Sequence, residues 1–205
     1  MTNNPFAYSQ PISKLDRFVG REDELRRILS ELRREMSISI VGERRIGKTS
    51  LLKILLIKLP DEVSTRDAPE TYFIYLDLQM MESKDKPIDF WNEVLDELAD
   101  RVTDTELKET IQQLCQAGRI NTRSLNTLFR QLGNAGLSIV LLLDEFDRLA
   151  DHPNFGPDFF YGLRALVINH RLALVTTSYT ELNNLSLTDL LPDSPKLRAV
   201  LLTAS

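Results

Sequence analysis

The stretch Gly42-Glu43-Arg44-Arg45-Ile46-Gly47-Lys48-Thr49 decides the fold of this chain. It fits the pattern G-x-x-x-x-G-K-[ST], in which glycines let the backbone turn tightly and present amide N–H groups to anionic oxygens. Residues 37–41 before it (Ser-Ile-Ser-Ile-Val) are rich in β-branched side chains and predict a short strand. Residues 48–59 after it are apolar on nearly every side, so they predict a buried helix that ends at Pro60. A loop between a strand and a helix N-terminus is well placed to bind phosphate.

The residue types in this loop explain how it would bind a nucleotide. Lys48 places a positive charge across the terminal phosphates, and the hydroxyl of Thr49 is a ligand for the accompanying Mg2+. The sequence leaves open whether Arg44 and Arg45, at variable positions, face solvent or a partner. The competing interpretation, a glycine-containing turn with an ordinary surface lysine, is disfavoured by the flanking strand and helix. We therefore predict a nucleotide site formed by Gly42, Glu43, Arg44, Arg45, Ile46, Gly47, Lys48, Thr49 and Ser50.

An acidic pair, Asp144-Glu145, follows the continuous apolar run of residues 137–143. Such a run predicts a central parallel strand that is covered on both faces. Because open parallel sheets bind ligands at the carboxyl ends of their strands, Asp144 would hold Mg2+ through water, close to the phosphate loop if the two strands are neighbours. Glu145 would accept a proton from the water that attacks the γ-phosphate, or orient that water. Acidic residues can also merely solvate a turn, but the phosphate loop favours the functional interpretation.

Hydroxyl side chains end the last apolar strand of the pattern, residues 172–177. Thr177 and Ser178 could hydrogen-bond the γ-phosphate or the attacking water from beside the acidic strand. Strand propensity and turn chemistry explain the same residues equally well. We therefore count Thr177 and Ser178, together with Lys48 and Glu145, as candidate catalytic residues.

Strands alternate with helices along most of the chain, which predicts an α/β fold with a parallel sheet and helices on both faces. Residues 1–13 contain two prolines and no apolar periodicity, so they predict a surface arm, and residues 14–205 form the core domain. The expected helices are 22–35, 48–59, 87–101, 105–117, 122–132 and 157–169, and the expected strands are 37–41, 71–78, 137–143 and 172–177.

Length and composition are those of one globular domain, with 205 residues of which 42% are hydrophobic. The 25 Lys and Arg against 30 Asp and Glu give a net charge of −5, so the chain lacks the positive field of a dedicated nucleic-acid binder. The single cysteine, Cys115, excludes an internal disulfide and a cysteine-built zinc site. The N-terminal residues do not resemble a secretory signal, and no apolar run reaches the ~20 residues that span a bilayer. These features predict a cytoplasmic protein that does not contact the membrane.

Three segments together resemble the P-loop ATPase core of the AAA+ and STAND groups: Phe18-Val19-Gly20-Arg21-Glu22, GERRIGKTSLL and LLLDEFDRL. In particular, the chain is similar to prokaryotic AAA-like ATPase domains, which are related to archaeal ATPases, origin-recognition proteins and NACHT-type signalling proteins. The resemblance covers residues 15–191 and implies a three-layer P-loop NTPase core that binds ATP or ADP with Mg2+. It also implies that Val19, Gly20 and Arg21 lie near the adenine, although a helix-capping turn explains them too. Asp144 would be the magnesium-associated acid, Glu145 the catalytic base and residues 177–178 the first sensor.

The chain departs from these groups in two ways. Origin-recognition relatives usually have asparagine at the first sensor and several STAND branches have arginine nearby, whereas this chain has Thr176-Thr177-Ser178. Members also continue into a helical lid or winged-helix domain, whereas this chain ends at Ser205, so we expect a core truncated before a complete C-terminal lid. Residues 196–203 are either the last core strand or a frayed end. No arginine finger can be assigned among Arg148, Arg164, Arg171 and Arg198.

The motifs predict an ATP-binding, Mg2+-dependent ATP-hydrolysing domain that acts as a nucleotide-controlled switch, with a protein partner or self-association. A regulatory module that binds ADP or ATP with little turnover is the alternative from another class. The ATPase part of a DNA-associated, origin-recognition-like protein is a further one, although the charge gives nucleic-acid binding no direct support. No [NT]-K-x-D motif follows the acidic pair, which disfavours a GTPase, and the VGRE segment with the acidic pair disfavours a small-molecule kinase.

Overall fold

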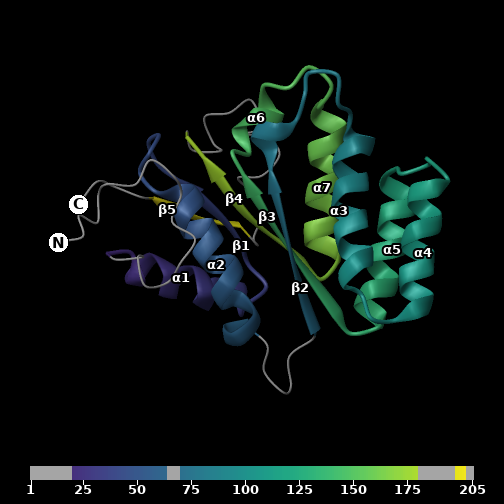
Figure 1. Ribbon diagram of the computed structural model, residues 1–205, viewed down its shortest axis with the longest axis horizontal. Helices are drawn as coiled ribbons and strands as arrows, with labels where there is room; N and C mark the ends of the chain where they lie inside the picture. Colours follow the sequence, from purple (N-terminus) through teal and green to yellow (C-terminus); the bar gives the residue numbers. More distant parts are fainter. Residues whose placement is uncertain (1–19, 64–69, 180–196, 202–205) are drawn as a thin grey trace, which may run out of the picture.

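The computed structural model describes residues 20–63, 70–179 and 197–201 (Figure 1). It contains one five-stranded sheet in the order β2-β3-β4-β1-β5, and all four neighbouring pairs are parallel. The predicted α/β class with a parallel sheet is therefore confirmed. The strands are β1 (Ser37–Val41), β2 (Glu70–Asp77), β3 (Leu137–Asp144), β4 (Leu172–Ser178) and β5 (Leu197–Leu201).

Helices cover both faces of the sheet and make a three-layer structure (Figure 1). Helices α1 (Glu22–Leu32) and α2 (Lys48–Val63) lie on one face. The other face carries α3 (Pro87–Arg101), α5 (Thr122–Asn134) and α7 (Pro157–Asn169), with α4 (Thr105–Gln116) packed outside against α3 and α5. A 3-10 turn, η2 (Leu78–Met80), follows β2, and a short helix, α6 (Asp147–Ala150), follows β3.

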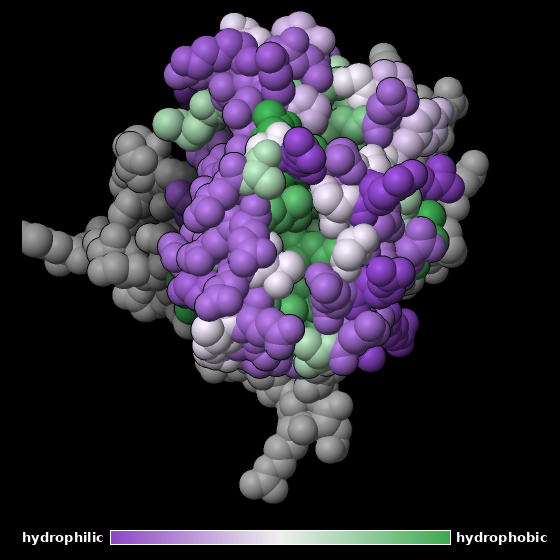
Figure 2. Space-filling view, turned by 90° about the vertical axis from the view of Figure 1, so that its right-hand side faces the viewer, coloured by the Kyte–Doolittle hydropathy of each residue, from purple (hydrophilic) through white to green (hydrophobic). Residues whose placement is uncertain are grey.

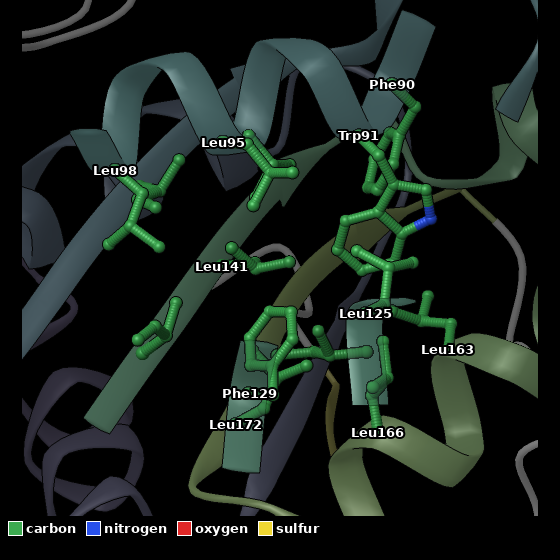
Figure 3. Close-up of a cluster of buried hydrophobic side chains, with 14 of the residues drawn as sticks. Phe90, Trp91, Leu95, Leu98, Leu125, Phe129, Leu141, Leu163, Leu166 and Leu172 are labelled. Atoms are coloured by element: carbon green, nitrogen blue, oxygen red, sulfur yellow. The ribbon is translucent and has the colours of Figure 1, made fainter. Parts of the chain in front are cut away.

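The buried side chains of β3 alternate between the two faces and so divide the core into two clusters. Leu141 and Leu143 belong to the larger cluster, beneath α3, α5 and α7, where Phe90 and Trp91 pack edge to face (Figure 3). Val140 and Leu142 belong to the cluster beneath α1 and α2. This two-sided burial explains why residues 137–143 read as one continuous apolar run.

Local sequence signals set several boundaries. Helix α3 begins at Pro87, and the Asp89 carboxylate accepts a hydrogen bond from the Lys86 N–H at 2.8 Å. The α4 cap, Asp104, likewise accepts from the Leu107 N–H at 3.0 Å. Pro60, by contrast, does not end α2, which continues to Val63. Proline removes the N–H that would donate to the carbonyl four residues earlier, and only three further residues of the helix follow it.

The ends of the chain are described only in part. The proposed arm, residues 1–13, lies outside the described residues, as does Val19. Of the two alternatives for residues 196–203, the strand is confirmed for the described residues 197–201, because β5 pairs with β1 from Ser37 to Val41. Within the described ranges no helix is long and apolar enough to cross a membrane.

The outer face over α4 and α5 is mostly hydrophilic, with an apolar furrow between polar flanks (Figure 2). A groove of about 440 Å³ there has Leu114 and Leu128 in its lining, together with Arg119 and Arg123. The two helices that line it, α4 and α5, lie on the opposite side of the sheet from α2 (Figure 1).

Candidate nucleotide site

The phosphate-binding loop leaves β1 and enters α2 at the carboxyl edge of the sheet. Its first N–H, that of Gly42, donates to the Ser178 carbonyl of β4 at 3.3 Å, and the Leu51 N–H donates to the Gly47 carbonyl at 2.9 Å as α2 begins. Gly47 has φ +97°, where a side chain would be strained, and no heavy atom lies within 4 Å of the position a Cβ would take. The loop therefore has the open, glycine-dependent turn that a phosphate group requires.

Lys48 is folded into this loop. Its side chain is buried, with 6% of the residue exposed, and Nζ donates to the carbonyls of Gly42 at 2.8 Å and Glu43 at 3.0 Å. Burial lowers the pKa of the Lys48 ammonium, while the nearby negative charges of Glu145, Asp147 and Asp144 oppose that shift. The loop carbonyls thus hold the ammonium where phosphate oxygens could replace them as partners.

The sequence left open whether the strand that ends in Asp144 neighbours the strand before the phosphate loop. It does not, because β4 lies between β3 and β1. Asp144 ends β3 and is 1% exposed. Across the sheet, Leu143 pairs with Thr176, and Ser178 pairs with Val41 at the start of the loop. The end of β4 therefore connects the acidic residues to the phosphate loop.

Thr177 makes that connection through its side chain. The fully buried Thr177 hydroxyl donates to Oδ1 of Asp144 and accepts from the Glu145 N–H at 2.9 Å. Its carbonyl accepts from the Phe146 N–H at 2.8 Å. Glu145 itself has φ +57°, an uncommon conformation for a residue with a side chain, and Thr177 contacts both sides of this turn. Of the two hydroxyl candidates, Thr177 is thus the one hydrogen-bonded to both acidic residues, and Ser178 contributes its carbonyl to Gly42.

Tyr75 is a site residue that the sequence analysis missed. It lies on β2, and its hydroxyl donates to Oδ2 of Asp144 at 3.3 Å. Burial raises the pKa of the Tyr75 hydroxyl, and the negative charges of Asp144 and Asp77 raise it further. In the sequence Tyr75 is one of several aromatic residues typical of a strand, so only the partner across the sheet reveals it.

Arg21 reaches the phosphate loop from the start of α1. Its guanidinium donates to the Ile46 carbonyl at 3.2 Å and to Glu24 Oε1 at 3.1 Å. Gly20 has φ +86°, and its N–H donates to Oε1 of Glu22 at 3.2 Å. Arg21 thus contacts the phosphate loop, while the position of this segment near the adenine stays a prediction.

The remaining loop residues are more accessible. Glu43, Arg44 and Arg45 are exposed, and the Arg44 guanidinium lies 5.9 Å from the centre of the Tyr179 ring. Thr49 and Ser50 are half-buried in the first turn of α2. In the described part of the chain no three His, Cys, Asp or Glu side chains are grouped to hold a metal ion. Mg2+ fits this arrangement, because it commonly takes one or two protein ligands and completes its shell with phosphate oxygens and water.

Residues 18–180 match the family described as ATPase domains predominantly from Archaea. The chain belongs to this family. No curated protein sequence matches the ATPase domain significantly.

Solved structures resemble the ATPase domain over nearly all of its length. The ORC1 protein of Aeropyrum pernix, solved in complex with DNA, has a TM-score of 0.63 at 18% identity over 92% of this chain and 46% of its own. The ORC2 protein of the same organism, in ADPNP and ADP complexes, has a TM-score of 0.67 at 14% identity over 97% and 50%. The Walker-type ATPase PABY2304 of Pyrococcus abyssi has a TM-score of 0.55 at 19% identity over 95% and 56%. The chain thus has the P-loop ATPase fold and spans about half the length of these proteins.

Proposed function

We propose that this ATPase domain binds Mg2+·ATP at residues 42–50 and hydrolyses it, acting as a nucleotide-controlled switch. The observation that carries the proposal is Thr177, whose hydroxyl is bonded to both Asp144 and Glu145 at the end of the strand that also anchors Gly42. This places an acid pair beside a phosphate-binding loop with a buried lysine. Those are the parts that phosphoryl transfer to water requires.

Each residue has a role that its position supports. Lys48 exchanges its loop carbonyls for β- and γ-phosphate oxygens. The Thr49 hydroxyl, and the Asp144 carboxylate through water, would hold Mg2+. The bound ion would neutralise phosphate charge in the reaction. Glu145 orients and deprotonates the attacking water, while Thr177 and Ser178 occupy the first-sensor position. The remaining loop residues bind phosphate through the backbone.

The adenine side of the site is formed by Val19, Gly20 and Arg21. The hydrogen bond from Arg21 to the Ile46 carbonyl supports this proposal, because it places the start of α1 against the phosphate loop. The boundaries 1–13 for an arm and 14–205 for the core belong to the same proposal. We also propose that the domain is of the STAND type and that it binds a protein partner or a second copy of itself.

A cytoplasmic setting is proposed from cysteine usage. Burial raises the pKa of the half-buried Cys115 thiol, which makes it a weak nucleophile at neutral pH.

A DNA-associated role is a weaker proposal. It rests on the ORC1 likeness alone, since the net charge of −5 offers no basic field.

The proposal is tested by Glu145→Gln, which keeps the size of the side chain and removes the base. Phosphate release should fall about 10²-fold or more while ATP binding is retained. The control is Glu109→Gln, an exposed glutamate of α4, which should leave turnover unchanged. Absence of ATP turnover by the unmutated protein across a range of protein concentrations would instead favour the regulatory module, and a preference for GTP in competition would exclude the ATPase.

A further inference from the structure

The hydroxyl of Tyr75 lies on the same face of the sheet as the Asp144 carboxylate. Tyr75 pairs with Leu142 across the β2–β3 register, and both pack in the cluster beneath α1 and α2. Asp144, two residues after Leu142, projects to that same face. This is the face against which the nucleotide-binding helix α2 packs.

The Asp144 carboxylate therefore accepts a hydrogen bond from a hydroxyl group on each of the two strands that flank β3. Thr177 of β4 donates to Oδ1, and Tyr75 of β2 donates to Oδ2 at 3.3 Å. A carboxylate can only accept, so in both bonds the hydroxyl group is the donor and Asp144 is the acceptor. Two donors on opposite oxygens restrict rotation of the carboxylate about its own axis.

We propose that Tyr75 is a positioning residue that holds Asp144 in the orientation required to bind the water shell of nucleotide-bound Mg2+. The inference rests on the proposed function and assigns it one further residue. Tyr75 acts through Asp144 and needs no contact with the nucleotide. The two oxygens turn together as one planar group, so the second donor, on Oδ2, adds to the restraint that Thr177 places on Oδ1.

Loss of the Tyr75 hydroxyl should affect magnesium more than nucleotide. Partners that orient a metal ligand through a hydrogen bond typically change metal affinity by 10- to 100-fold when removed. The bond here is long, at 3.3 Å, so the lower end of that range, about tenfold, is expected. Nucleotide affinity without Mg2+ depends on the loop and should not change.

Tyr75→Phe removes only the hydroxyl, and Tyr72→Phe is its matched control on the same strand. The Tyr72 hydroxyl donates to Glu70 at 2.8 Å, at the opposite end of β2 from the site. Binding of a fluorescent, non-hydrolysable ATP analogue is measured with EDTA and during Mg2+ titration. The expected result is unchanged affinity in EDTA for all three proteins and a Mg2+ midpoint raised about tenfold in Tyr75→Phe alone.

Three outcomes overturn the inference. A Tyr75→Phe midpoint equal to that of Tyr72→Phe shows that the hydroxyl does not act on Mg2+. Weakened binding of Tyr75→Phe in EDTA shows damage to the loop instead of positioning. An ATPase rate of Tyr75→Phe that stays low at saturating Mg2+ also contradicts a positioning role, since excess Mg2+ should restore a site that is only mispositioned. Absence of any Mg2+ dependence in the unmutated protein would instead contradict the proposed function itself.

Discussion

Thr176 and Thr177 are adjacent, both buried and chemically identical, yet their hydroxyl groups have opposite surroundings. The Thr177 hydroxyl has two partners, Asp144 and Glu145. The Thr176 hydroxyl is buried without a hydrogen-bond partner among the described residues. Because alternate residues of a strand face opposite sides, one threonine lies at the site and its neighbour lies over the larger core cluster.

This difference predicts opposite effects of the same substitution. Thr177→Val leaves the Glu145 N–H and one Asp144 oxygen without their partner, so it should lower the free energy of unfolding by about 1–3 kcal/mol. Thr176→Val replaces an unpaired hydroxyl by a methyl group of similar shape and should be neutral or stabilising. Urea unfolding of the two variants checks this. Equal destabilisation by both would show that the Thr177 hydrogen bonds contribute nothing to stability.

His170 provides a polar contact between two helices that cover the larger core cluster, α7 and α5. At the end of α7 the ring Nε2 lies 2.9 Å from Oδ1 of Asn126 on α5. The neutral ring can donate this hydrogen bond to the amide oxygen. Burial lowers the pKa of His170 below its ordinary value of 6.5, and the positive charge of Arg130 contributes to the shift.

The direction of this shift predicts how stability responds to acid. The unfolded chain binds a proton at His170 more readily than the folded protein, so stability present above pH 6.5 is lost as the pH falls through the lowered pKa. His170→Gln removes the titration and keeps a donor. The Tm measured by thermal unfolding should therefore fall less steeply between about pH 7.5 and 5 for His170→Gln than for the unmutated protein. Parallel curves would assign the acid response to other groups.

At the scale of the whole molecule, nucleotide should stabilise the ATPase domain, because the site joins four strands, β1 to β4, and the start of α2. A ligand at 100 times its dissociation constant adds about 2.7 kcal/mol to the free energy of unfolding. For a domain near this size that corresponds to a rise in Tm of roughly 5–10 °C.

Lys48→Ala is the test of that stabilisation. It removes the buried ammonium and its bonds to the Gly42 and Glu43 carbonyls, so Mg2+·ATP should no longer shift Tm. Lys108→Ala, on α4 and away from the loop, is the control and should keep the full shift. An unchanged shift in Lys48→Ala would show that the nucleotide binds elsewhere.

The sequence by itself determined the fold class, the phosphate loop and the acidic pair. These follow from local patterns: a strand, a glycine-dependent turn and a buried helix in immediate succession, and an apolar run that ends in Asp144-Glu145. The helices at residues 87–101 and 157–169 were also predictable to the residue, because proline opens each of them. Pro60 misled the same reasoning, since a proline in a last turn need not end a helix.

Only the tertiary structure decided how the parts of the site meet. The position of β4 between β1 and β3 depends on long-range strand pairing, which no local pattern encodes. That order distinguishes Thr177, bonded to both acidic residues, from Ser178, and it leaves Asp144 between β2 and β4. Tyr75 becomes a site residue for the same reason, because its partner is 69 positions away in sequence and adjacent only across the sheet. Strand order is set by the packing of the whole core, and it decides which hydroxyl groups reach the carboxylate.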